Sequence, residues 1–99
     1  MAPSDLHDRI AEAVSRFPEG KNVRRVRLFG SRLTGDYRPE SDYDFIVDLQ
    51  PTLSLFGLVA LKRVLKEALG AEVDVMTAGG VHPVIRKRVL HDAVTVYEG

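Results

Sequence analysis

Apolar residues recur along the chain at two spacings, one typical of helices and the other typical of strands. From residue 3 to 17 they recur every three or four positions, which predicts a helix. Residues 54–69 repeat that spacing, with Ser54 suited to cap the first turn and Gly70 suited to end the last one. A third helix is predicted over residues 83–91, where a proline occupies the first turn.

Four segments rich in β-branched and aromatic residues predict strands between these helices. They are Val23–Phe29, Tyr43–Leu49, Glu72–Met76 and Val94–Tyr97. The centre of the second segment is apolar without a break, which is typical of a strand covered on both faces. The order of the elements predicts a small α/β (α+β) domain with a mixed sheet and helices mainly on one face.

Length and composition narrow the classes of protein to consider. A chain of 99 residues is expected to form one domain, residues 1–99, with little stability to spare, and association with another chain is a common remedy. Fourteen basic residues balance fourteen acidic ones, so a general nucleic-acid coat is disfavoured. The sequence has no cysteine, which excludes disulfides and thiol catalysis and suits the cytoplasm. A membrane role is not expected, because the start is polar and the longest mostly apolar run, 53–61, is too short to cross a bilayer.

The segment Gly30-Ser31-Arg32 follows the first predicted strand and is a candidate phosphate-binding turn. Backbone N–H groups at such a turn attract phosphate, and a glycine allows a bulky anion to approach closely. Ser31 adds a hydroxyl group and Arg32 a permanent positive charge. Taken alone, the segment is a weak signal and favours an ordinary loop, because Gly-Ser turns are common.

Three aspartates are candidate metal ligands. Asp42 and Asp44 are two residues apart at the start of the second strand, so their side chains project on the same side. Asp74 lies in the third strand and would join them if the two strands are neighbours. A divalent cation removes the repulsion between such carboxylates, and hard oxygen ligands favour Mg²⁺ or Mn²⁺. The alternatives are a solvated turn for Asp42 and a solvent-facing edge strand for Asp74.

The combined pattern resembles the polymerase β-type nucleotidyltransferases. The resemblance lies in Gly30-Ser31, Gly35 and Ser41-Asp42-x-Asp44, and the short chain is similar to the minimal nucleotidyltransferases (MNT) that act as antitoxins beside HEPN-domain toxins. One departure is Thr34, where many of these proteins carry a second basic residue.

The resemblance implies an enzyme that transfers AMP from ATP to a hydroxyl, a tyrosine of the HEPN toxin, with two magnesium ions. It assigns metal binding and catalysis to Asp42, Asp44 and Asp74, and a catalytic role to Ser31 as well. Binding of the triphosphate is assigned to Gly30 and Ser31, with Arg32 assisting. Two other functions stay open: neutralisation of the toxin by binding alone, and nucleotidyl transfer to a small molecule or RNA.

Other polar and apolar residues have simpler interpretations. Asp36, Glu40 and Asp48 are expected to be surface acids, and Arg24, Arg25 and Arg27 to form a solvated strand face. The histidines show no metal-ligand spacing. The 54–69 helix has more apolar residues than one stripe needs, so Phe56 and Val64 contribute either to a broad core face or to a contact surface for a partner or a second copy.

Overall fold

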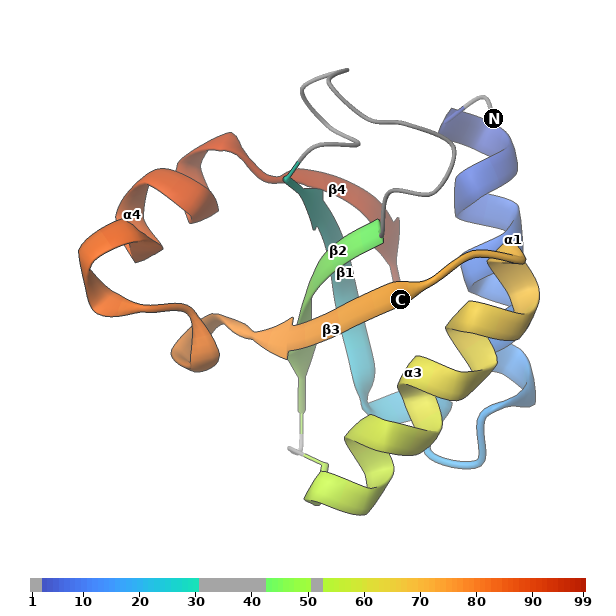
Figure 1. The fold of residues 1–99 in the computed structure, drawn as a ribbon. Helices are drawn as coiled ribbons and strands as arrows, with labels where there is room; N and C mark the ends of the chain where they lie inside the picture. The colour runs from blue at the N-terminus through green and yellow to red at the C-terminus, as the bar shows by residue number, and fades with distance from the viewer. Residues whose placement is uncertain (1–2, 31–42, 51–52) are drawn as a thin grey trace.

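A computed structural model describes residues 3–30, 43–50 and 53–99 of the protein. Figure 1 shows how its helices and strands are arranged. In order they are α1 (Pro3–Arg16), β1 (Val23–Phe29), β2 (Tyr43–Leu49), α3 (Leu55–Leu69), β3 (Val73–Thr77), α4 (Pro83–Asp92) and β4 (Val94–Glu98), with short 3-10 turns η1 (Gly20–Asn22) and η2 (Ala78–Gly80).

The four strands form one mixed sheet in the order β3-β2-β1-β4. β1 is antiparallel to both of its neighbours, whereas β2 and β3 run parallel. A parallel pair needs a long crossover, and α3 supplies it. The predicted α/β fold with a small mixed sheet is therefore confirmed.

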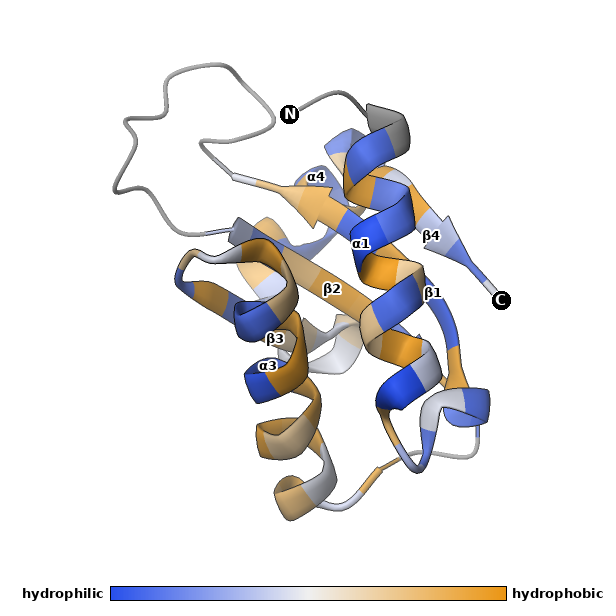
Figure 2. Cartoon of the chain, turned by 90° about the vertical axis from the view of Figure 1, so that its right-hand side faces the viewer, coloured by the Kyte–Doolittle hydropathy of each residue, from blue (hydrophilic) through white to orange (hydrophobic). Residues whose placement is uncertain are grey.

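α1 and α3 pack side by side on one face of the sheet and enclose the main core (Figure 2). Ile10 of α1 and Leu61 and Leu65 of α3 are fully buried. The ends of α3 follow the predicted signals: Ser54 accepts a hydrogen bond from the Gly57 N–H at 3.2 Å, and Gly70 adopts the left-handed conformation with φ 64°.

The opposite face of the sheet carries α4, so the helices lie mainly but not wholly on one face (Figure 1). β3 and β4 are the two edge strands, and the segment with η2 and α4 connects them across this second face. Ile46 in the middle of β2 points away from the main core and is fully buried as well. β2 is therefore covered on both faces, as its unbroken apolar run predicts.

No helix within the described ranges is long and apolar enough to cross a membrane.

Candidate active site

Asp44 and Asp74 lie opposite each other on the parallel pair β2 and β3. Neighbouring strands are about 4.8 Å apart, so the two carboxylates start from adjacent positions. The flanking residues Tyr43, Phe45 and Val73 all belong to the main core, and side chains alternate along a strand. Both aspartates therefore face away from α1 and α3, on the side of the sheet where α4 lies.

Gly30 brings the end of β1 to the same place. Phe29, the last residue of β1, pairs with Asp44, and Gly30 follows with φ 82°. A side chain at Gly30 would overlap Oδ2 of Asp44, so a residue with a Cβ would have to displace the carboxylate. From the sequence, a glycine was expected here because it lets a bulky anion approach the backbone closely. The structure adds a second reason, because the Asp44 carboxylate also lies close to this backbone.

The two aspartates differ in their access to solvent. Asp44 is half-buried between β1 and β3, whereas Asp74 is exposed on an edge strand. The protein around Asp44 restricts the position of its carboxylate, whereas the carboxylate of Asp74 is accessible to a substrate from solvent. Asp74 thus faces water, as the simpler interpretation expected, and it also lies next to Asp44, as the metal hypothesis required.

Part of the predicted site cannot be placed. Ser31, Arg32 and Asp42, together with Asp36 and Glu40, lie outside the described residues. Among the residues that are described, no three His, Cys, Asp or Glu side chains are grouped so that they could hold a metal ion. The structure thus brings together Gly30, Asp44 and Asp74, and the roles of all six candidate residues stay predictions.

The expectation that Asp48 is a surface acid and that Arg25 and Arg27 form a solvated strand face is wrong. Asp48 is a half-buried member of an ion-pair cluster and not an isolated surface acid: it accepts hydrogen bonds from Arg25 Nε at 2.6 Å and from Arg27 Nη2 at 3.2 Å. Only 13% of the Arg27 side chain is exposed, so β1 does not present a solvated basic face there. The sequence shows that these residues have opposite charges on two predicted strands. It does not show that they meet, because that depends on the register that pairs Arg25 with Asp48. Arg24 is exposed, as expected.

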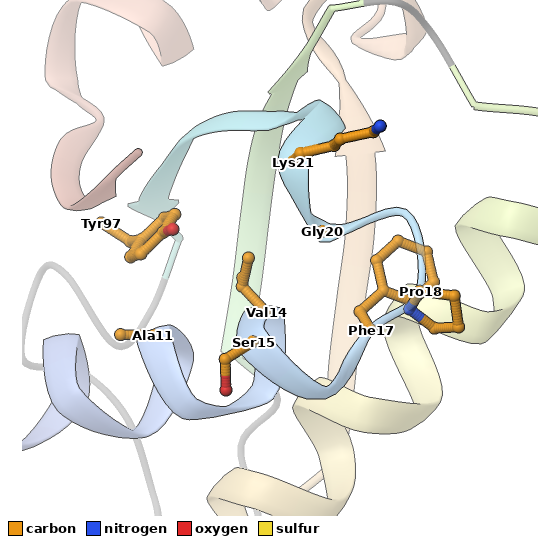
Figure 3. Close-up of a pocket in the computed structure, with 8 residues that line it drawn as sticks. All are labelled: Ala11, Val14, Ser15, Phe17, Pro18, Gly20, Lys21 and Tyr97. Carbon is orange, nitrogen blue, oxygen red and sulfur yellow. The ribbon is translucent and has the colours of Figure 1, made fainter.

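Two hollows in the surface differ in their relation to the aspartates. One of about 330 Å³ is lined by α1, η1 and Tyr97 of β4 (Figure 3). β4 is the edge strand farthest from Asp74, and α1 covers the opposite face, so this hollow is remote from the candidate site. The other, of about 740 Å³, lies along α4 on the side of the aspartates.

The apolar residues of α3 divide between core and surface. Leu61, Leu65 and Leu69 are buried, whereas Leu55, Phe56 and Val59 are exposed, Phe56 to 87%. Val64 is half-buried and packs against the core. The broad core face therefore accounts for Val64, and Phe56 belongs to an exposed apolar patch on the first turns of α3.

Comparisons with known proteins bear on the family and the fold of the chain. A family model described as "Nucleotidyltransferase domain" matches residues 7–96. A Methanocaldococcus jannaschii protein that is provisionally named a protein adenylyltransferase is 42% identical over 75% of this chain and 80% of its own length. The protein adenylyltransferase MntA of Thermococcus cleftensis is 34% identical, over 75% of each chain.

Solved structures have the same fold. One provisionally described as a minimal nucleotidyltransferase is 30% identical, covers 95% of both chains and has a TM-score of 0.74. A toxin–antitoxin complex with AMP-PNP gives a TM-score of 0.75 at 22% identity, over 94% of this chain and 73% of the other. A Shewanella oneidensis complex of an AMPylated HEPN toxin with its MNT antitoxin gives 0.68 at 19% identity, over 99% and 74%.

Proposed function

Because this chain belongs to the nucleotidyltransferase-domain family and is a nucleotidyltransferase, we propose that it transfers AMP from ATP to a partner protein, and that the partner is a HEPN-domain toxin for which it is the antitoxin. The transfer to protein is supported by three relatives above 30% identity that are named protein adenylyltransferases, two of them provisionally. The HEPN partner is supported by a solved complex of that composition with the same fold.

The observation that carries the proposal is the register of Asp44 with Asp74 beside Gly30. Two carboxylates in adjacent positions on neighbouring strands repel each other, and a bound divalent cation relieves that repulsion. In a nucleotidyltransferase they serve as ligands for the cations that accompany a nucleoside triphosphate.

The donor set suits two magnesium ions. Asp44 and Asp74 offer hard oxygen ligands on an accessible face, and Asp42 is the proposed third ligand. Bound there, the ions would neutralise charge on the phosphates and favour ionisation of the acceptor hydroxyl. Manganese is the other cation compatible with such ligands.

The rest of the site would hold the donor. Gly30, with the backbone and hydroxyl of Ser31 and the guanidinium of Arg32, would bind the triphosphate of ATP. The acceptor oxygen, proposed to be that of a tyrosine, attacks the α-phosphorus and loses its proton. The bond from that phosphorus to the pyrophosphate breaks, so AMP becomes esterified to the acceptor and pyrophosphate leaves. ATP as the donor supports a reaction in the cytoplasm.

The test is transfer to the partner, measured by intact mass. The purified chain, a HEPN-domain protein from the same organism, ATP and Mg²⁺ are expected to give a partner whose mass rises by one or more AMP groups. Asp44→Asn is expected to abolish this change, because it removes a negative ligand at nearly constant volume. Phe56→Asp, on the exposed apolar patch of α3, is the control for a surface change that leaves transfer intact. An unmodified partner with the wild-type chain contradicts the proposal.

Neutralisation by binding alone is distinguished with the double variant Asp42→Asn/Asp44→Asn. We expect this variant to bind the toxin but to protect cells poorly. Full protection by it would show that covering the toxin is sufficient.

A further inference from the structure

We propose that the outer surface of α4 is the docking surface for the acceptor protein, and that it receives an apolar patch of that protein bordered by carboxylates. This inference rests on the proposed function, because it concerns how the acceptor reaches the same site. The surface is defined by Val84, Ile85, Lys87 and Arg88.

The C-terminal end of α4 lies close to the site. The helix ends at Asp92, and Val94, the first residue of β4, pairs with Leu28 two residues before Gly30. The start of α4 follows η2 and the far end of β3, which ends three residues beyond Asp74. The helix also lies on the face toward which both aspartates project (Figure 1). An acceptor that approaches these carboxylates from the open side therefore meets α4.

The apolar residues of α4 contribute little to the hydrophobic core. No residue of this ten-residue helix is buried, and Val84 and Ile85 are exposed to 83% and 50%. Within the described residues, α4 makes few contacts with the strands or with the other helices. Apolar side chains that do not support the core, beside a hollow of about 740 Å³, are typical of a binding surface.

The first turn of α4 is nevertheless held in place. His82 Nδ1 accepts a hydrogen bond from the Val84 N–H at 3.2 Å, and Arg86 donates to the carbonyl oxygens of Val81 at 3.0 Å and Gly79 at 3.2 Å. These bonds fix the backbone that carries Val84 and Ile85. A partner then meets a preformed surface, which lowers the entropic cost of binding.

The positive charge of this surface indicates which residues should border the apolar patch of the partner. Lys87 and Arg88 are exposed, and the Arg88 side chain is 88% exposed with Asp92 only at 4.0 Å. An ion pair as exposed as that of Arg88 with Asp92 adds little attraction. The charges of Lys87 and Arg88 are therefore available to a partner. Carboxylates around an apolar centre are the complementary chemistry, and they would speed association at low salt.

The patch of Leu55, Phe56 and Val59 on α3 is a matched control. It is equally apolar and exposed, but α3 covers the opposite face of the sheet. A protein bound there would not be brought to Asp44 and Asp74.

The experiment measures binding to a HEPN-domain protein from the same organism by calorimetry, with Val84→Asp and Phe56→Asp compared with the wild type. Both positions are exposed, so each variant is expected to fold. Val84→Asp is expected to weaken the complex at least about tenfold, and Phe56→Asp less than about twofold. Arg88→Glu should slow association and flatten its dependence on salt.

The outcomes separate docking from function. Tight binding by Val84→Asp, equal weakening by both variants, or no binding by the wild type would overturn the docking proposal. Normal binding of the wild type without transfer of AMP would overturn the proposed function, while the effect of Val84→Asp on affinity would still support docking. ATP binding by Val84→Asp, measured separately, is expected to equal that of the wild type, because the substitution lies outside the nucleotide site.

Discussion

Gly30 lies against the carboxylate of Asp44, with no room for a side chain between them. The glycine follows β1 in the left-handed conformation, at φ 82°, and Asp44, the second residue of β2, lies directly opposite Phe29. A turn that is proposed to bind phosphate is thus in contact with a carboxylate that is proposed to bind metal. The first prediction tests this contact.

Gly30→Ala is expected to reduce AMP transfer on the order of 100-fold, because the new methyl group displaces the Asp44 carboxylate. The left-handed conformation should cost about 1–2 kcal/mol in the free energy of unfolding. Transfer rates and urea unfolding measure the two effects separately.

Gly70→Ala is the matched control. Gly70 has a similar φ of 64°, but an added Cβ would have nothing within 4 Å. We expect a similar loss of stability of about 1 kcal/mol and unchanged transfer. An equal loss of activity in both variants would mean that strain, and not the contact with Asp44, is responsible.

Asp74→Asn is expected to lower transfer by about 100-fold or more while the protein remains folded, because Asp74 is exposed and its repulsion of Asp44 disappears. Mg²⁺ should raise the melting temperature of the wild type and have less effect on this variant, because a ligand that binds only the folded state stabilises it. Melting curves with Mg²⁺ and with a chelator test this, and equal shifts in both proteins would contradict the metal assignment.

Asp48→Asn is expected to destabilise the protein by about 1–3 kcal/mol, because it leaves Arg27, only 13% exposed, without its carboxylate partner. Catalysis should persist, since Asp48 lies four residues beyond Asp44 along β2. Urea unfolding measures the loss. Asp92→Asn, which disrupts an exposed pair at 4.0 Å, should change stability by less than about 0.5 kcal/mol.

The carboxyl group of Glu72 is expected to titrate below its usual pKa of 4.5, because it accepts a hydrogen bond from Lys66 and lies beside its charge, at 2.7 Å. A pKa that is lower in the folded state gives a stabilisation present above pH 4.5 and lost as the pH falls through the folded value. NMR titration of Glu72 tests this. Lys66→Met should return the pKa toward 4.5, and an unchanged value in that variant would contradict the assignment.

The sequence predicted the local elements well, because their signals are local. β1 and β2 have the bounds that β-branched and apolar residues indicate, and α3 ends at Gly70 as a left-handed cap requires. β3 begins one residue later than predicted, at Val73, since a strand ends where its pairing ends and not where its composition changes. The family resemblance was likewise carried by short motifs and is confirmed by the family match over 7–96.

Only part of the candidate site could be predicted from the sequence. Its three aspartates could be named from their spacing, but the adjacency of Asp44 and Asp74 depends on which strands pair and in which register. The same is true of Asp48, whose partners Arg25 and Arg27 lie more than twenty residues away.

By itself, then, the sequence determined the helices, the strands and the kinds of chemical group they carry. Periodicity and capping act over a few residues and can be read directly from the chain. The tertiary structure decided which groups meet: Gly30 with Asp44, Asp44 with Asp74, and α4 with the face where they lie. These contacts depend on strand order and on helix packing, which are set by burial of the whole apolar surface and not by any one segment.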